Sequence, residues 1–330
     1  MSKQWATARL ECITQAVSKD PIIPTRTLAR FLTTNHPDLF PNIESARLSI
    51  RSYRGAKGGR DRHLQIFSNE KRKINVPDSD IAPEPTEPVH VALKGHGTII
   101  SDLHIPYHSK SAIEAALEHA QKINAMEWLF INGDLVDFYQ ASEWSRNPKA
   151  RDIDSELEMA RNFLEELSKY YPRIIYKLGN HERRFTTYLQ IHATAIANMK
   201  CLSFEERFNV KKFNIELIKA QQIVYAGAYL VILHGHEFGT SAASPVNPAR
   251  GAFLRTKTNC LVGHHHKTST HVETDAHRKV ISAFSLGCLS DLSPPYAPVN
   301  SYVHGFATMH MDGNDFEIDN YRITSNYKVR

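Results

Sequence analysis

The fold is decided by the stretch Trp128-Leu129-Phe130-Ile131-Asn132-Gly133-Asp134-Leu135-Val136-Asp137, an apolar run that stops at a glycine and a carboxylate. Four large apolar residues in succession predict a strand buried inside an α/β sheet, with Asp134 at its carboxyl end. Open α/β sheets carry their ligand-binding groups at that end of the strands. The stretch therefore predicts both a sheet and the edge of the sheet at which a site lies.

The same pattern of an apolar run followed by a polar side chain recurs four times, at residues 98–104, 173–182, 230–236 and 259–266. Each of the five predicted strands ends in Asp, Asn or His. A single Gly-Asp or Gly-Asn-His is more often a turn than a site. The buried ends of strands do not need carboxylates or imidazoles, and such groups must find partners there. Metal ions are the simplest partner that all five strand ends could share.

Length and composition limit the class of protein. The 330 residues, 42% of them hydrophobic, are enough for one large domain and a small one. The apolar runs are far shorter than the roughly 20 residues of a membrane span, and the N-terminus has no apolar signal core. We therefore expect no membrane partner and a cytoplasmic location, in a bacterial or phage-infected cell. The four cysteines are too far apart for a zinc pair or a disulfide framework, and we expect four buried thiols.

Charge is unevenly distributed along the chain. Residues 1–75 contain 14 lysines and arginines against 6 aspartates and glutamates, a surplus of eight positive charges. Since the whole chain has a net charge of +5, the remaining residues have a net charge of −3. A basic small segment joined to a slightly acidic large one predicts that the small segment meets a polyanion, and nucleic acid is the expected partner of residues 1–75.

Residues 1–75 contain three short helical patterns. The first covers residues 3–18, the second begins at Thr25 as its cap and stops at Pro37, and the third runs from Pro41 to Gly55. The third has Arg47, Arg51 and Arg54 on one face, and a basic extension follows at residues 54–62. These features predict a small all-α, helix-turn-helix-like domain. A solvated basic helix that docks on the larger domain remains an alternative.

The remaining residues divide into a linker and a large domain. Residues 76–94 are rich in proline and acids, without an apolar period, and predict a linker. Residues 95–330 then form the large domain. Helical patterns at 109–124 and 151–171 alternate with the first three strands, which predicts a parallel β-α-β-α-β arrangement. We expect an insertion within 183–227, strands at 279–285 and 305–311, a hairpin turn at 312–315, and a second sheet packed on the first.

Five motifs together resemble one family. They are Asp102-x-His104, Gly133-Asp134-x-x-Asp137, Gly179-Asn180-His181-Glu182, His234-Gly235 and Gly263-His264-x-His266. In this order they resemble the calcineurin-like metallophosphoesterase superfamily, and the first and last motifs are similar to its nuclease and phosphodiesterase-type branch. The resemblance implies an α/β fold, a two-sheet αββα sandwich, which here follows a small all-α helix-turn-helix-like domain.

The resemblance also implies a binuclear metal site. One metal would take Asp102, His104 and His266, the other Asn180, His234 and His264, and Asp134 would bridge the two. A hydroxide generated at the metals would attack phosphorus, and His181 would act as the general acid for the leaving group. Ligation by nitrogen and oxygen without sulfur suits several divalent metals; we favour Mn, with Fe, Zn, Ni, Co or Mg as alternatives.

Further residues have weaker roles in this hypothesis. Asp137 and Glu182 are expected to orient metal ligands rather than bind metal themselves. Four arginines are candidates to bind the substrate phosphate, although a loop arginine is usually just solvated: Arg183, Arg184, Arg250 and Arg255. His236 and His265 lie next to candidate ligands as pocket walls or bystanders, and bystander is favoured for His265.

The expected reaction is hydrolysis of phosphodiester bonds, with nucleic acid as the substrate that the basic segment favours. A phosphomonoesterase or protein serine/threonine phosphatase with the same two-metal site is the alternative. Against the protein phosphatases, Asp137 is followed by Phe138 and Tyr139 where those enzymes have Arg-Gly. A non-catalytic DNA-binding regulator is a third possibility, and the complete ligand set argues against it. The physiological metal, DNA against RNA, and the oligomeric state stay open.

Overall fold

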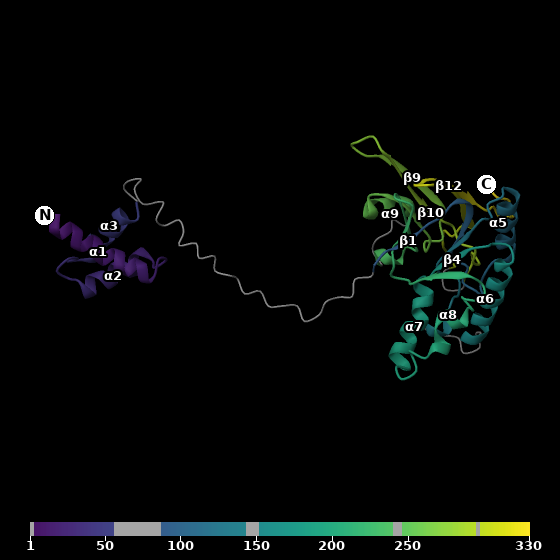
Figure 1. Ribbon diagram of the computed structural model, residues 1–330, viewed down its shortest axis with the longest axis horizontal. Coiled ribbons are helices and arrows are strands. Elements are labelled where there is room, and N and C mark those ends of the chain that lie inside the picture. Colours follow the sequence, from purple (N-terminus) through teal and green to yellow (C-terminus); the bar gives the residue numbers. More distant parts are fainter. Residues whose placement is uncertain (1–2, 56–86, 143–151, 240–245, 295–297) are drawn as a thin grey trace. The chain divides into compact units, whose positions relative to one another are not determined.

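The computed structural model describes residues 3–55, 87–142, 152–239, 246–294 and 298–330. The chain divides into two compact units, Met1–Pro83 and Glu84–Arg330 (Figure 1). Most of the predicted basic extension at residues 54–62 lies outside the described residues, and so does most of the predicted linker at 76–94. Among the helices of the described ranges, none has both the length and the apolar composition that crossing a membrane requires.

The first unit contains three helices, α1 (Lys3–Lys19), α2 (Thr25–Asn35) and α3 (Ile43–Tyr53). Their apolar faces form a small core of Ile13, Leu28, Ala29, Leu32, Phe40, Ala46 and Ile50. Asn42 caps α3, because its side chain accepts a hydrogen bond of 2.8 Å from the Ser45 amide. Thr25 is the first residue of α2 rather than its cap, since Pro24 precedes it without a side-chain hydrogen bond.

One arginine of the predicted basic face of α3 is used inside this unit. Arg54 donates hydrogen bonds to the Ile23 carbonyl at 2.6 Å and to Thr25 Oγ1 at 2.7 Å, so it ties the end of α3 to the start of α2. Arg47 pairs with Glu44 at 2.9 Å, whereas Arg51 is exposed. The helices exist as expected, and a helix-turn-helix function for them stays a prediction.

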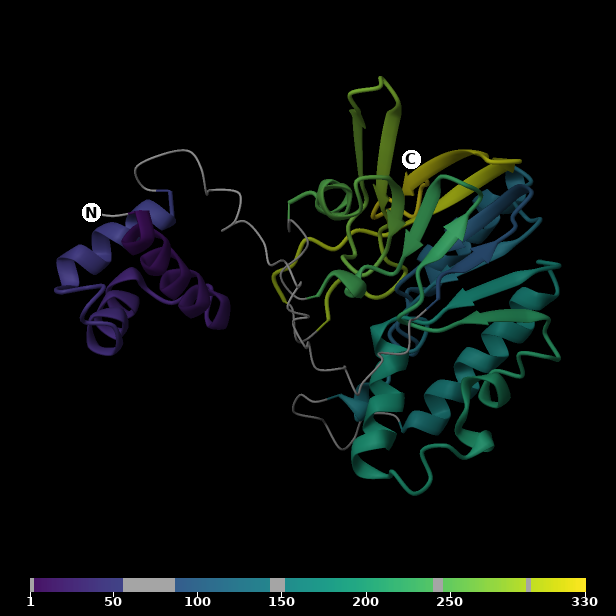
Figure 2. The same cartoon turned by 60° about the vertical axis from the view of Figure 1, so that its left-hand side comes forward.

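The second unit consists of two six-stranded sheets. The first has the order β12-β11-β2-β3-β4-β5, with β12 (Asp315–Arg322), β11 (Gly305–Asp312), β2 (Gly95–Ile100), β3 (Leu129–Asn132), β4 (Ile174–Lys177) and β5 (Ile215–Ile218). The second has the order β1-β6-β7-β8-β10-β9, with β1 (Val89–Val91), β6 (Val224–Ala226), β7 (Leu230–Leu233), β8 (Asn259–Val262), β10 (Val280–Ser285) and β9 (Ser269–Thr274). Figure 2 shows the β9–β10 hairpin extending from the rest of this sheet.

Helices cover the outer faces of the two sheets (Figure 1). Helices α5 (Lys110–Lys122) and α6 (Ile153–Ser168) connect parallel strands β2, β3 and β4, and their apolar faces pack on the first sheet. The second sheet is covered by α9 (Pro248–Thr256). The remaining helical segments are η1 (Tyr139–Ala141), α7 (Asn180–His192), η2 (Lys200–Leu202), α8 (Phe204–Arg207) and η3 (His236–Phe238).

Successive side chains of a strand point to opposite faces of the sheet, so an unbroken apolar strand places apolar side chains on both faces. A hydrophobic core covers each of these faces. In β3, Leu129 and Ile131 belong to the core beneath the helices, whereas Phe130 belongs to the core between the sheets. Ile100 and Ile99 of β2 divide in the same way. The expected sandwich of two sheets flanked by helices is therefore confirmed, and the interlocked sheets hold their strand ends in fixed positions.

Three sequence-based expectations are corrected by the structure. The segment 183–227 is not an insertion over its whole length, because β5 pairs with β4 in the first sheet and β6 pairs with β7 in the second. The segment Val89–Val91, expected within the linker, forms β1 and pairs with β6, so the large unit begins before Gly95. Four buried thiols were expected, yet Cys201 is exposed and Cys12 is only half-buried.

Candidate metal centre

Five strand ends from the two sheets meet at one place. Asp102 and His104 follow β2, Asp134 follows β3 and Asn180 follows β4, all in the first sheet. From the second sheet, His234 follows β7, and His264 and His266 follow β8. Parallel strands that run in the same direction bring their carboxyl ends to one edge, and the packing of the two sheets brings the two edges together.

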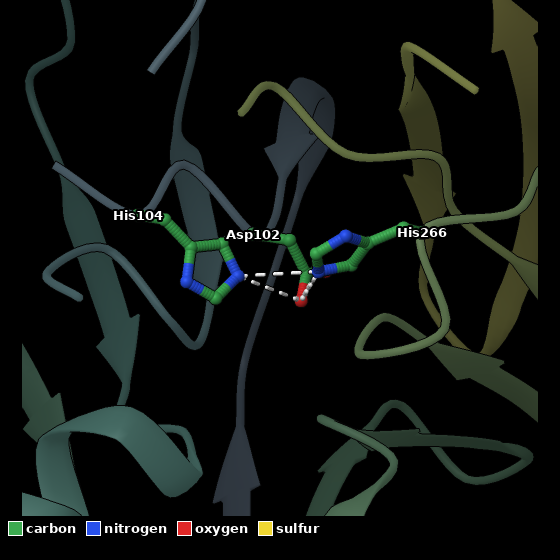
Figure 3. A group of neighbouring side chains, drawn as sticks. All are labelled: Asp102, His104 and His266. Atoms are coloured by element: carbon green, nitrogen blue, oxygen red, sulfur yellow. Dashed lines mark hydrogen bonds and ion pairs between the residues drawn. The ribbon is translucent and has the colours of Figure 1, made fainter. Parts of the chain in front are cut away.

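The first cluster consists of Asp102, His104 and His266 (Figure 3). His266 Nε2 lies 3.3 Å from Asp102 Oδ1 and 3.1 Å from His104 Nε2. His104 Nε2 lies 4.0 Å from Asp102 Oδ1. Three potential ligand atoms from two sheets therefore point at one small volume.

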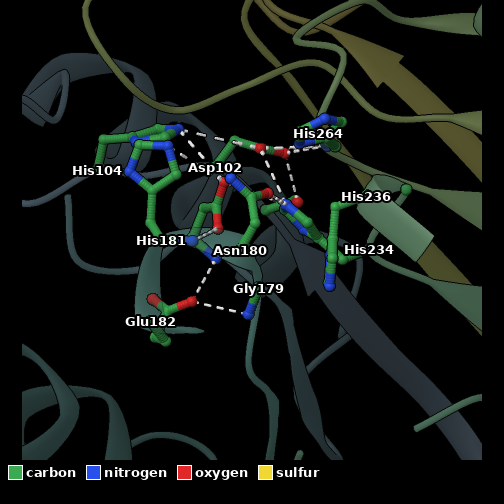
Figure 4. Close-up of polar contacts among 12 residues, drawn as sticks. Asp102, His104, Gly179, Asn180, His181, Glu182, His234, His236 and His264 are labelled. Carbon is green, nitrogen blue, oxygen red and sulfur yellow. Dashed lines mark hydrogen bonds and ion pairs between the residues drawn. The ribbon is translucent and has the colours of Figure 1, made fainter. Parts of the chain in front are cut away.

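The second cluster surrounds His234 (Figure 4). His234 Nε2 lies 3.1 Å from Asp134 Oδ2 and 3.1 Å from Asn180 Oδ1. Ligand atoms of Asp134, His234 and His264 lie within 4.8 Å of one another. The expected second metal set of Asn180, His234 and His264 is thus brought together around the Asp134 carboxylate.

Asp134 lies between the two clusters. Its Oδ2 is 3.1 Å from His234 Nε2 in the second cluster and 3.9 Å from His104 Nε2 in the first. The position is that of a carboxylate shared by two cations, which in two-metal sites are roughly 3.5–4 Å apart. Asp134 is 1% exposed and Asp102 is fully buried, so neither carboxylate is solvated by bulk water.

The donor set fits divalent cations. Metal–nitrogen and metal–oxygen bonds of roughly 2.0–2.2 Å place neighbouring ligand atoms of one ion about 3 Å apart, similar to the Nε2 and Oδ separations of both clusters. Two histidines also have their other ring nitrogen engaged. His104 Nδ1 lies 3.0 Å from Asp137 Oδ1, and His234 Nδ1 lies 2.6 Å from the Asn132 carbonyl. Such contacts fix the tautomer and leave Nε2 free to bind a metal.

The electrostatics of the clusters reflect buried charges held close together. Burial alone would raise the pKa of Asp134, but the charges of His234 and His181 hold this pKa well below its usual range. Burial alone would lower the pKa of His234, but the charge of Asp134 raises it to about 10. Burial lowers the pKa of His264 to about 3, so its imidazole is neutral and able to act as a ligand. The site is therefore built for positive charge next to ionised carboxylates.

His181, at the start of α7, forms a third group with His104 and Asp134, whose potential ligand atoms lie within 4.8 Å of one another. Its Nδ1 is 2.8 Å from the Asp137 carbonyl and 3.1 Å from Asp137 Oδ1, while its Nε2 is 3.9 Å from Asp134 Oδ2. The carboxylates of Asp134 and Asp137 outweigh burial and raise the pKa of His181. Asp137 thus contacts both His104 and His181, as expected for a residue that orients other side chains.

Glu182 connects the segments that follow β3 and β4 through hydrogen bonds to their backbone. Its carboxylate accepts hydrogen bonds from the amides of Asp134, Val136 and Gly179, at 3.0, 3.1 and 2.7 Å, and from the Tyr176 hydroxyl at 2.7 Å. A β-carbon on Gly179 would collide with Asp134 Oδ1, so this position needs glycine. Glu182 therefore contacts the backbone at the strand ends and, among the residues described, no candidate ligand side chain, and its role in orienting ligands stays a prediction.

The structure adds a buried ion pair that the sequence analysis missed. Lys177, fully buried at the end of β4, lies 2.7 Å from Glu237 Oε1. Glu237 also accepts hydrogen bonds from the amides of His234 and Gly235, at 3.1 and 2.6 Å. The pair connects the two sheets and fixes the backbone of a candidate ligand. The sequence feature that could have predicted this ion pair is a lysine within an otherwise apolar strand.

Several candidate ligands have a left-handed backbone. The φ angles are 56° at Asp102, 53° at His104, 52° at Asp134, 65° at His264 and 54° at His266. Positive φ is uncommon for residues other than glycine and asparagine, and it clusters at functional sites. The sharp turns that these conformations create aim side chains from the strand ends into the site.

The four candidate phosphate-binding arginines differ in position. Arg184 Nη2 lies 3.2 Å from His181 Nε2, and Arg184 Nη1 donates to the Asp137 carbonyl at 3.2 Å. Arg183, Arg250 and Arg255 are exposed, and within the described ranges no contact connects their guanidinium groups to the clusters. Arg255 lines a cavity on the other side of β7, together with Tyr225 and Glu237. Arg184 is therefore the arginine that the geometry places at the site.

His236 and His265, the two histidines next to candidate ligands, also occupy different positions. The His236 ring packs against His234, with centroids 5.4 Å apart, and burial lowers its pKa to about 4. The His265 ring packs on the His264 ring at 5.2 Å. Neither belongs to a cluster that could hold a metal among the described residues, so both are neighbours of candidate ligands.

Comparisons with solved structures find chains of low similarity, among them three Vps29 proteins. Vps29 of Chaetomium thermophilum is 12% identical, with a TM-score of 0.39 over 72% of this chain and 95% of that one. Vacuolar Protein Sorting 29 from Cryptosporidium parvum is 14% identical, with a TM-score of 0.40 over 72% and 94%. Wild-type Vps29 from Entamoeba histolytica, complexed with zinc, is 12% identical, with a TM-score of 0.38 over 71% and 96%. Likeness this distant says nothing of activity or substrate.

No curated protein sequence matches the chain. A family model for calcineurin-like phosphoesterases, in contrast, matches residues 98–297. The match spans more than half of the 330 residues and includes every residue of the two clusters. The chain therefore belongs to the calcineurin-like phosphoesterase family, and it is a metal-dependent phosphoester hydrolase.

Proposed function

We propose that this hydrolase cleaves phosphodiester bonds in nucleic acid with two divalent cations. The observation that carries the proposal is the convergence of two ligand clusters around Asp134, because a shared carboxylate suits a pair of cations better than a single one. Asp102, His104 and His266 would hold one cation, Asn180, His234 and His264 the other. We favour manganese, since the donors are nitrogen and oxygen without sulfur; Fe, Zn, Ni, Co and Mg fit the same donors.

Bound cations would supply Lewis acidity for the phosphoryl oxygens and a water-derived nucleophile. The residues of the chain supply the rest. In this proposal His181 donates a proton to the leaving oxygen, and the contact of its Nδ1 with the Asp137 carbonyl at 2.8 Å supports this role. Because a guanidinium can only donate, Arg184 now occupies the His181 Nε2 lone pair. When Arg184 binds a phosphate oxygen instead, Nε2 becomes free to take up a proton from solvent and to donate it to the leaving group.

The N-terminal unit supports nucleic acid as the substrate class. Arg26 and Arg30 lie one helical turn apart on α2, and both are exposed, as is Arg51 on α3. Within the described part of the chain, these three guanidinium groups form no ion pair, unlike Arg47 with Glu44. Exposed arginines without acidic partners are suited to phosphate contacts that do not depend on base sequence.

The substrate class is tested with two chromogenic esters. With manganese present, the protein should hydrolyse bis-(p-nitrophenyl) phosphate faster than p-nitrophenyl phosphate, and a chelator should abolish both reactions. A clear preference for the monoester would contradict the proposal and favour a phosphomonoesterase or protein phosphatase. Single- and double-stranded DNA, RNA and a phosphopeptide, assayed in the same buffer, then identify the natural polymer.

Substitution of the bridging carboxylate should remove metal and turnover together. We expect Asp134→Asn to lower kcat/KM by more than roughly 100-fold, because changes to residues that only orient ligands already cost about 10- to 100-fold. Metal content per chain, measured by mass spectrometry after dialysis, should fall in parallel. Asp319→Asn, on the exposed surface of β12, is the matched control and should keep both metals. Two tightly bound metals in Asp134→Asn would exclude a bridging role.

The role of His181 predicts a dependence on the leaving group. His181→Gln should slow hydrolysis of a dinucleotide by roughly 100- to 10,000-fold, because an alkoxide needs a proton as it leaves. The same variant should slow bis-(p-nitrophenyl) phosphate much less, since p-nitrophenolate leaves without one. His192→Gln, exposed on the same helix α7, serves as the control. An equal loss on both substrates would show that His181 positions other groups instead of donating a proton.

The exposed arginines predict a salt dependence of nucleic-acid binding. In the full chain, Arg26, Arg30 and Arg51 are replaced together by glutamine. The slope of log K against log salt concentration should become shallower by roughly 0.9 for each duplex phosphate contact that is lost. Glutamine at Lys110, Lys122 and Lys200, exposed lysines of the second unit, removes the same charge and should leave the slope unchanged. Equal slopes for both triple variants would exclude this surface as the binding site.

A further inference from the structure

A cavity of about 870 Å³ opens beside the first ligand cluster. Its walls include the segment after His104, from Pro106 to Ser109, and the segment Tyr302–His304. Both segments are tied to candidate ligands, because the Tyr107 amide donates to the His104 carbonyl at 2.6 Å and the Val303 amide donates to the His266 carbonyl at 2.8 Å. Two walls of the cavity are therefore joined to candidate ligands of the first cluster.

Aromatic rings dominate the walls of this cavity. Tyr107, Tyr302 and Tyr327 line it, together with the His304 imidazole. The Tyr302 ring packs on the ring of His266, with centroids 4.5 Å apart, and Tyr327 stacks over His304 at an interplanar angle of 22°. Tyr107 is 43% exposed and Tyr327 is 45% exposed. The Tyr107 ring also lies edge-on to Tyr139, with centroids 6.4 Å apart. Tyr107 and Tyr327 are nevertheless partly exposed on the cavity side of the chain, where a further planar group could stack on them.

The polar groups of the cavity suit an anionic ligand with hydrogen-bonding edges. Arg322 lines the wall, and among the described residues its guanidinium has neither a hydrogen bond nor an ion pair. Asp291 lines it as well, where its carboxylate accepts from the Ser293 amide at 3.0 Å. A guanidinium and a carboxylate for the hydrogen-bonding edge of a base, and tyrosines for stacking on its face, together match a nucleotide base more closely than a peptide or a simple phosphate.

We propose that this cavity binds the base of a nucleotide whose phosphate lies at the metal centre. The inference rests on the proposed function and deepens it, because it assigns nucleotide recognition to the catalytic unit and not only to residues 1–75. The volume falls within the roughly 300–1,000 Å³ of small-molecule sites. A stacked base next to the first cluster would position its own phosphate at Asp102, His104 and His266.

The test compares two ligands that differ only in the base. Binding of adenosine 5′-monophosphate and of ribose 5-phosphate to the full chain with manganese is measured by calorimetry. The nucleotide should bind roughly tenfold or more tightly, the usual contribution of stacking on an aromatic side chain. Tyr107→Ala and Tyr327→Ala should lose this preference, whereas Tyr107→Phe and Tyr327→Phe, which keep the rings, should retain it. Tyr170→Ala, at a tyrosine that is 57% exposed outside the cavity, is the control and should retain it.

The outcomes separate this inference from the proposed function. Equal affinity of the unsubstituted protein for both ligands, or a preference that survives in both alanine variants, overturns the cavity as a base site. The absence of measurable binding of adenosine 5′-monophosphate overturns it too. Turnover of bis-(p-nitrophenyl) phosphate is assayed in the same preparation. If the diester is hydrolysed while the two ligands bind equally, the base site is excluded and the proposed function stands. If the nucleotide is preferred but the diester is not hydrolysed, the base site stands and the proposed function is excluded.

Discussion

Two carboxylates buried next to each other constrain the whole second unit. Removing a single ionised group from water costs several kcal/mol even after the protein relaxes, and Asp102 and Asp134 are both shielded from solvent. The cost is offset only if positive charge or hydrogen-bond donors surround the two groups on every side. The imidazoles of His234 and His266, and the backbone amides of His181 and His264, provide them in this structure. Divalent cations would offset the same charge more completely.

The two sheets must hold that arrangement to within a fraction of an ångström. Apolar packing between the sheets sets their separation, but packed side chains alone tolerate small shifts. Beneath the site the contacts are directional. The side-chain Nδ2 of Asn132 donates to the Leu233 carbonyl at 2.8 Å, and the backbone carbonyl of Asn132 lies 2.6 Å from His234 Nδ1. With the Lys177–Glu237 pair, these contacts align the sheets at the ligands themselves.

The sequence was sufficient for features that repeat a local pattern. The apolar runs and their polar ends predicted the parallel core and the edge at which the site lies, because parallel strands bring their carboxyl ends to one edge. The set of residues that meet there came from the family resemblance, since strand direction does not bring the ends of two separate sheets together. Hairpin β11–β12 followed from its turn residues. Strands β1 and β6 have three residues each, too few for a recognisable period, and they become strands only through pairing with each other and with β7.

Partners distant in the chain were the features that the sequence could not reveal. Nothing near Lys177 indicates that Glu237 lies opposite, and the pattern of α3 could not show that Arg54 turns inward to Ile23 while Arg51 faces solvent. The sequence does not distinguish the four candidate arginines from one another, and only the geometry singled out Arg184. Local periodicity predicts which face of an element is apolar, whereas the choice among polar partners depends on the packed chain.

The left-handed ligand residues have a consequence for the evolution of the chain. Each non-glycine residue in that conformation stores strain, of order 1–3 kcal/mol, that glycine would relieve. As long as metal binding is selected, the aspartates and histidines persist despite the strain. Were that selection to end, glycine at positions 102, 104, 134, 264 and 266 would relieve this strain. Glycines at these sites in a related sequence would therefore mark a domain that has given up catalysis and kept its fold for another use.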